Sequence, residues 1–200
     1  MAGAHVIYFI VLCFLVISSG QRRRNVRKQA SPIDGVQIQE NFNIDQFSGK
    51  WYLIGVASHC TYLRSSSYSV EAVVMQVSNE KETVRTNTLH KMEGICWDIK
   101  QEYKKTRTIG KFYRKKRGVT TYMAVGETDY SKYAIIAVQQ TPKQKLTLKL
   151  YGRSTELDEN IQMKFRQHVI QHKIPEIFIY EFPSYGHCQS ADEFHRLDDS

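Results

Sequence analysis

Hydrophobic and polar residues alternate through the middle of the chain. At residues 95–103 the odd positions are mostly apolar and the even positions polar, and at residues 146–150 every second residue is leucine. A period of two with one apolar face is typical of half-buried antiparallel strands. We predict eight strands, at residues 50–58, 68–77, 82–90, 95–103, 109–115, 119–127, 132–140 and 145–152.

Short connections join these strands. Turn-forming pairs such as Glu93-Gly94 and Arg117-Gly118 separate several of them. Strands that follow one another closely pair as an antiparallel meander, and eight of them can close into a barrel that has no open edge. The pattern therefore predicts an all-β fold, an eight-stranded antiparallel up-and-down β-barrel whose interior can hold one small ligand.

After residue 152 the period changes to that of a helix. The residues with helical spacing are Leu157, Ile161, Phe165, His168 and His172. They predict one C-terminal α-helix at about residues 155–172, which begins with a capping box of Thr155 and Asp158 and ends before Pro175. The helix should pack on the outside of the barrel because the interior has no room for it. A short ninth strand is predicted at residues 177–182, followed by a polar tail.

The first twenty residues have the composition of a signal peptide. Val6 to Ile17 is an uncharged apolar run that is too short to span a bilayer, and Ser18 and Gly20 provide small residues for cleavage after residue 20. We therefore expect a secreted, extracellular protein with no membrane span of its own. The predicted parts are a signal peptide at residues 1–20, a basic flexible arm at residues 21–40 and the barrel domain at residues 41–200.

An odd number of cysteines remains after export. Cys13 leaves with the signal peptide, so the mature chain keeps Cys60, Cys96 and Cys188. At least one of these thiols cannot pair within the chain, and spacing alone leaves three possible single pairings among the three cysteines. Cys96 lies on the polar, outward face of its predicted strand, where the tail that follows the external helix can reach it. This orientation favours a Cys96–Cys188 disulfide and leaves Cys60 near one end of the barrel.

Positive charge is concentrated in two places in a chain with a net charge of +8. Five basic residues lie between residues 22 and 28, and eight lie between residues 104 and 117 without an acidic residue among them. We interpret the second cluster as a solvated hairpin, because exposed charge runs mostly provide solubility. Nucleic acid is not an expected partner, since the chain carries no recognisable binding motif for it.

No catalytic or metal-binding motif is found in the sequence. His168 and His172 have metal-ligand spacing, but two ligands are too few for a closed zinc site. His59 and Cys60 are adjacent, and neighbours on a strand point to opposite faces, which argues against a nucleophile pair. We therefore expect a binding protein without a cofactor or metal rather than an enzyme.

Three short motifs resemble the signatures of the lipocalin family. They are Gly49-x-Trp51, Thr128-Asp129-Tyr130 and Arg153, in the family's order and at suitable spacing. The resemblance implies a calyx whose closed base is filled by Trp51. It also implies that the guanidinium of Arg153 stacks on that indole ring, as a cation–π contact.

The resemblance is stronger to the lipocalins that are subunits of a complement complex. The stretches that carry it are residues 30–33, 45–51, 94–97, 127–130, 149–154, 185–188 and 191–195. In that branch a first-loop cysteine, here Cys60, forms a disulfide to the larger alpha chain, and the other two cysteines, here Cys96 and Cys188, pair internally. A loop of the alpha chain enters the barrel mouth. Through that chain the subunit joins the beta chain and the assembly of the membrane attack pore.

Two other family functions remain open at this point. Some lipocalins with an unpaired first-loop cysteine scavenge haem and radicals, in which case Cys60 has a redox role. Others carry small lipophilic ligands in the calyx. The basic arm and the Lys/Arg-rich hairpin do not discriminate between these functions.

Overall fold

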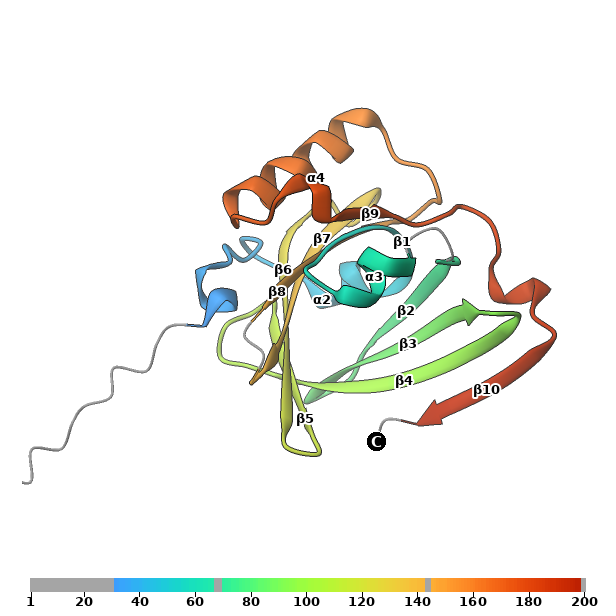
Figure 1. The fold of residues 1–200 in the computed structure, drawn as a ribbon. Coiled ribbons are helices and arrows are strands. Elements are labelled where there is room, and N and C mark those ends of the chain that lie inside the picture. The colour runs from blue at the N-terminus through green and yellow to red at the C-terminus, as the bar shows by residue number, and fades with distance from the viewer. Residues whose placement is uncertain (1–30, 67–69, 143–144, 199–200) are drawn as a thin grey trace, which may run out of the picture.

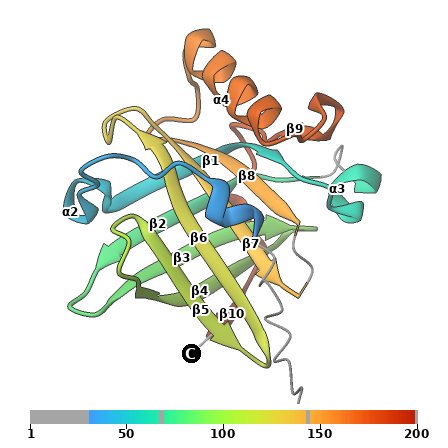
Figure 2. The same ribbon diagram turned by 90° about the vertical axis from the view of Figure 1, so that its left-hand side faces the viewer.

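The alternating segments of the sequence form a meander of antiparallel strands. A computed structural model describes residues 31–66, 70–142 and 145–198, and its ribbon is shown in Figures 1 and 2. The strands are β1 (Gly49–Ala57), β2 (Val73–Asn79), β3 (Thr83–Met92), β4 (Ile95–Lys105), β5 (Lys111–Lys116), β6 (Val119–Thr128), β7 (Tyr133–Thr141), β8 (Leu146–Gly152), β9 (Ile179–Glu181) and β10 (Glu193–Asp198). Single 3-10 turns are η1 (Pro32–Gly35), η3 (Glu176–Phe178) and η4 (Cys188–Ser190).

The first eight strands close into a barrel. Each pairs with the next in antiparallel fashion, β1 also pairs with β8, and β5 joins both β4 and β6. The prediction of an eight-stranded antiparallel barrel with one C-terminal helix is confirmed. The second strand starts at Val73 rather than at residue 68, because the chain first forms the short helix α3 (Thr61–Ser66) at the end of β1.

The barrel wall separates two apolar cores. The inner core lies inside the barrel and includes Trp51, Val77 and Val125. The outer core lies between the wall and helix α4 (Glu159–Gln171), which lies above the strands at the top of Figure 1, and includes Leu148 and Phe165. The external position that we predicted for the helix is therefore confirmed, since its apolar face covers the outside of β8.

The start of the helix differs from the prediction. Helix α4 begins at Glu159 with Asp158 as its N-cap, and no side chain caps it, so the expected capping box with Thr155 is wrong. The buried stripe is Ile161, Phe165 and Val169, at intervals of four residues. His168 was expected on this stripe, but Val169 takes the core position because a period of 3.6 allows either neighbour to face inward.

The flexible arm predicted at residues 21–40 does not extend to residue 40, because residues 31–40 are packed on the barrel. Ile33 and Val36 are buried in the outer core, and the side chain of Gln139 on β7 accepts hydrogen bonds from Ser31 Oγ at 2.6 Å and from the Ile33 amide at 2.9 Å. Residues 31–40 are thus anchored on the wall beside β6 and β7, as Figure 2 shows. The predicted signal peptide and residues 21–30 lie outside the described residues.

The polar tail contains a strand that we did not predict. Strand β10 runs parallel to β4, with Phe194 opposite Cys96 and Leu197 opposite Ile99, and both tail side chains are exposed. Because β10 packs against the sheet only through its edge, its sequence lacks the buried face that makes strands recognisable. None of the helices in the described part of the chain is long and apolar enough to cross a membrane.

Candidate functional site

The base of the barrel is closed by Trp51 and Arg153. The Trp51 indole is fully buried, and the Arg153 guanidinium lies 3.7 Å from the centre of its ring. The guanidinium also donates five hydrogen bonds to backbone carbonyls, of which three reach Gln46, Ser48 and Lys50 at 2.9–3.0 Å. Arg153 therefore joins the end of β8, the start of β1 and helix α2 (Ile44–Phe47).

The turn after β6 is built by Thr128, Asp129 and Tyr130. One carboxylate oxygen of Asp129 accepts hydrogen bonds from the amides of residues 131, 132 and 133 at 2.7–3.1 Å. Tyr130 has a positive φ of 64°, and the Thr128 hydroxyl accepts its amide hydrogen and donates to the carbonyl of Tyr133. The Tyr130 carbonyl then accepts a hydrogen bond from Arg153 Nε at 2.9 Å, so the three motifs meet at the closed end of the barrel.

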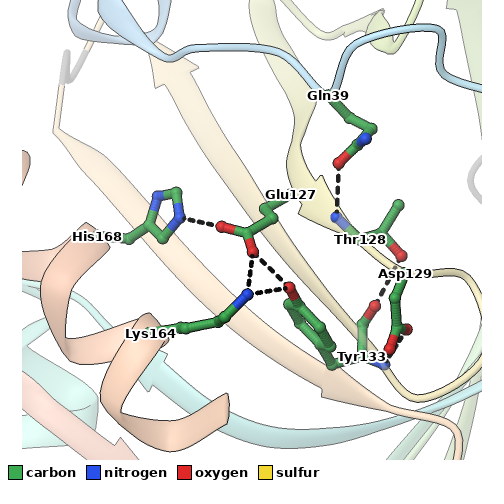
Figure 3. A network of polar contacts seen from close by, with 7 residues as sticks. All are labelled: Gln39, Glu127, Thr128, Asp129, Tyr133, Lys164 and His168. Atoms are coloured by element: carbon green, nitrogen blue, oxygen red, sulfur yellow. Dashed lines mark hydrogen bonds and ion pairs between the residues drawn. The ribbon is translucent and has the colours of Figure 1, made fainter. Parts of the chain in front are cut away.

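A polar network fixes helix α4 to the wall (Figure 3). The Glu127 carboxylate accepts hydrogen bonds from Lys164 Nζ at 3.0 Å, from His168 Nε2 at 2.8 Å and from the Tyr133 hydroxyl. Burial by itself would raise the pKa of Glu127, but the three hydrogen bonds outweigh it and lower the pKa to about 2. Nearby, the Gln39 side chain accepts the Thr128 amide hydrogen, which ties the N-terminal segment to the same strand.

The opposite end of the barrel opens into a cavity of about 750 Å³. Such a volume lies within the usual range for sites that enclose a small molecule. The apolar lining residues include Leu53, Met75, Met123 and Val138. The mouth is lined by Ser58, His59, Cys60, Thr61, Leu63 and Lys145, which come from the end of β1, helix α3 and the start of β8.

The cavity wall also carries polar side chains. Tyr103, Lys149 and Tyr151 line it, and burial raises the pKa of both tyrosines and lowers the pKa of Lys149. His90 also lines it, and burial together with the charge of Lys149 lowers the pKa of this imidazole. These groups were not singled out from the sequence. The sequence feature that could have indicated them is Lys149, which lies between Leu148 and Leu150. Because both leucines face the outer core, the lysine side chain faces the cavity.

Cys60 lies at the mouth of this cavity. It directly precedes helix α3, three residues after the end of β1, its side chain is exposed, and its thiol is free among the described residues. The Ser58 hydroxyl accepts its amide hydrogen at 3.2 Å, and its carbonyl accepts the Arg64 amide hydrogen, so the start of α3 fixes its backbone. The neighbouring His59 ring packs on Phe178 at 4.6 Å instead of on Cys60. The thiol is thus accessible to another molecule.

Cys96 and Cys188 are joined by a disulfide on the outside of the barrel. Their Cα atoms are 5.3 Å apart, and both residues are buried by the tail that passes over β4. The bond holds η4 and the start of β10 against the sheet. It lies on the outer surface of the wall, so it shapes the fold and does not line the cavity.

The remaining sequence candidates do not form a site. His168 Nε2 bonds to Glu127 and His172 Nδ1 bonds to the carbonyl of His168, and no group of three metal ligands occurs among the residues described. We predicted that the basic segment at residues 104–117 is a solvated hairpin, but two of its side chains contact other parts of the barrel. Lys111 forms an ion pair with Asp34 at 2.6 Å, and the Arg114 guanidinium lies 5.8 Å from the centre of the Tyr103 ring.

Comparisons with known proteins agree with this geometry. The family model described as the Lipocalin / cytosolic fatty-acid binding protein family matches residues 48–184. The complement component C8 gamma chain of Oryctolagus cuniculus is 32% identical over 184 residues, which cover 91% of this chain and 90% of that protein. Protein AMBP of Bos taurus is 30% identical over 80% of this chain, and the match spans 47% of AMBP, about half of its length.

A solved structure has the same fold. The siderocalin Ex-FABP superimposes with a TM-score of 0.63 over 70% of this chain and 96% of its own, at 21% sequence identity. At this identity the likeness concerns the barrel and not its ligand.

Proposed function

This chain belongs to the lipocalin / cytosolic fatty-acid binding protein family, and we propose that it is a secreted subunit of a complement complex. In this proposal Cys60 forms a disulfide with the larger alpha chain of complement component eight, and the barrel mouth binds a segment of that chain. Through the alpha chain the subunit also joins the beta chain and takes part in assembly of the membrane attack complex. It acts by binding and not by catalysis.

The observation that carries the proposal is the position of Cys60. Its thiol is exposed, is free among the described residues and lies in the lining of the cavity mouth. An extracellular compartment is oxidising and favours disulfides over lasting free thiols. A chain bonded there meets the mouth at a high effective concentration, so modest contacts are enough to hold it.

The similarity to the C8 gamma chain supports the same conclusion. It extends over nearly the whole of both proteins, whereas the match to AMBP spans half of that protein. By its name, the gamma chain is one chain of a component with several chains. A chain with an unpaired cysteine at the mouth of its barrel fits such an assembly.

A scavenger function of the kind expected from the sequence is the second candidate. The exposed thiol favours it, because a thiol at a cavity mouth can act on a bound ligand. This function requires a free thiol and no stable protein partner, so the two candidates predict opposite states of Cys60.

Co-expression with the complement component eight alpha chain tests the proposal. Wild-type chain should be secreted as a covalent complex, which separates on reduction. A Cys60→Ser variant should co-purify with the alpha chain without the covalent bond, because the mouth still binds its segment. A Tyr185→Ser variant, altered at an exposed residue of the tail, serves as the control. If both wild type and Cys60→Ser are recovered as free monomers, the proposal is wrong.

A further inference from the structure

Strand β5 carries positive charge on the outer face of the barrel, on the side that Figure 2 shows. Residues 103–126 include eight basic residues and neither Asp nor Glu. Because Phe112 is packed in the inner core, the alternation along β5 turns Lys111 and Lys115 outward. Lys111 is neutralised by Asp34, which lies 2.6 Å away, whereas Lys115 is exposed.

Three further basic side chains continue this charge along the length of β5. One is on the outward face of β4, opposite Tyr113, and the other two lie in the turns at either end of β5. Among residues 31–66, 70–142 and 145–198, no acidic side chain forms an ion pair with any of the four, and all four are exposed. Strand β5 has six residues, so the row extends over about 20 Å. We call this row the β5 strip; its members are Lys104, Arg107, Lys115 and Arg117.

The β5 strip is narrow. On β6 the outward side chains beside it are Thr120, Tyr122 and Ala124, which are uncharged. On β4 the next outward residue is Glu102, which lies opposite Arg85 on β3, so the positive charge ends there. The unpaired charges therefore form a line along one strand rather than a broad patch.

The second basic cluster of the sequence begins close to this strip. Ser31 Oγ donates a hydrogen bond to the Gln139 side chain at 2.6 Å, and Gln139 is opposite Tyr122, which is opposite Tyr113 on β5. Ser31 is thus held two strands, about 10 Å, from β5. Residues 22–28 carry five more basic residues, and the three residues that separate this segment from Ser31 span at most about 10 Å. The fold therefore brings the start of one basic cluster beside the other.

We propose that the β5 strip binds a sulfated glycosaminoglycan, a linear polyanion of the extracellular space. Sulfate groups recur along such a chain and can pair in turn with the ammonium and guanidinium groups of the strip. Like charges held in a row repel one another, and a bound polyanion removes this repulsion. The site is on the outside of the wall, whereas Cys60 lies at the mouth of the cavity, so this binding is separate from the proposed disulfide.

The shape of the strip favours a linear polyanion over an anionic membrane. A membrane surface is planar and would also lie against β6, where the outward side chains Thr120, Tyr122 and Ala124 offer it no positive charge. Four unpaired charges within about 20 Å also call for a densely charged partner. A polysaccharide that carries carboxylates alone supplies fewer charges over the same length.

The test is a fluorescence anisotropy titration of a labelled heparin dodecasaccharide with the full secreted chain, at physiological pH and ionic strength. Lys104→Gln/Lys115→Gln removes two charges of the strip and should weaken binding about tenfold, as expected for the loss of two surface ion pairs. The matched control is Lys132→Gln/Arg166→Gln, which removes two exposed charges in the turn after β6 and on helix α4. It has the same net charge and should bind as wild type does.

The dependence on salt gives a second readout. Binding to a polyanion releases counterions, so the affinity of wild type should fall steeply as the NaCl concentration rises. The slope of log affinity against log salt concentration should be shallower in Lys104→Gln/Lys115→Gln and unchanged in the control. Hyaluronan, which has carboxylates and no sulfates, should not displace the labelled dodecasaccharide.

Three results would overturn the proposal. The first is that wild type does not bind the dodecasaccharide. The second is that both double variants lose affinity equally, because net charge and not the strip would then account for binding. The third is that wild type binds vesicles containing phosphatidylserine but not the dodecasaccharide, which would assign the strip to a membrane surface. None of these measurements involves Cys60 or a partner chain, so their failure leaves the proposed function untouched.

Discussion

Replacing Arg153 should strongly destabilise the barrel. In the described structure its guanidinium donates five hydrogen bonds to backbone carbonyls and covers the Trp51 ring. A hydrogen bond to a charged group contributes about 1.5–3 kcal/mol, and a cation–π contact about 0.5–2 kcal/mol. These contributions share one side chain and do not add, and solvent reaches part of the site. We expect Arg153→Met to lower the free energy of unfolding by about 3–5 kcal/mol.

The lysine variant tests the geometry separately from the charge. Arg153→Lys keeps the positive charge but replaces a planar fork of donors with one ammonium, which cannot reach Gln46, Lys50 and Tyr130 together. We expect Arg153→Lys to lower the free energy of unfolding by about 2–3 kcal/mol. Lys132→Met is the control, because Lys132 is exposed and its ion pair with Asp158 at 3.8 Å should contribute less than about 0.5 kcal/mol.

Urea unfolding followed by tryptophan fluorescence measures these changes. The midpoint should fall for both Arg153 variants without a change in slope, because the unfolded state is unaltered. A loss below about 1 kcal/mol for Arg153→Met would refute the account of the base. Equal stability of Arg153→Lys and wild type would show that charge alone, and not the fork, closes the barrel.

Two further predictions concern the disulfide and the network at helix α4. Replacing Cys96 and Cys188 together by serine should lower the free energy of unfolding by about 2–4 kcal/mol, measured in urea, and unchanged stability would contradict the role given to this bond. For Glu127, the pKa of about 2 in the folded state lies below the ordinary value of 4.5, so its stabilisation is present above about pH 4.5 and is lost as the pH falls toward 2. Glu127→Gln should therefore be less stable than wild type at pH 7, and thermal melts of the two proteins should converge toward pH 2. Glu82→Gln, at an exposed residue outside the network, serves as the control. A stability gap at Glu127 that does not change with pH would argue against the network.

The barrel could be predicted from the sequence because several of its strands, such as β4 and β8, alternate with a period of two. Closure of eight strands, the external helix and the positions of Trp51 and Arg153 all depend on local patterns and on motifs of fixed spacing. The period does not show which face of a strand points into the barrel. On β8 the leucines face the helix and Lys149 faces the cavity. This wall is covered by the helix on one side and by the barrel interior on the other, so an apolar face can point in either direction.

The ends of the domain were less predictable for a related reason. Residues 31–36 and strand β10 are held by contacts with distant residues, such as Gln139 and the Cys96–Cys188 bond. Their own sequences have no periodic apolar face, and propensity alone does not show where an edge of the sheet accepts a further segment. The network at Glu127 likewise joins residues 37 and 41 positions apart in the chain.

Peptide mapping of the native protein, purified without reduction from the extracellular fluid of its source, tests the central claim most directly. Free thiols are blocked first, and the cysteine-containing peptides are then identified by mass spectrometry. The account predicts that Cys60 is joined to a cysteine of the alpha chain, while Cys96 and Cys188 are joined to each other. Recovery of Cys60 as a blocked free thiol, in a protein that migrates as a monomer of about 20 kDa with or without reductant, would contradict it.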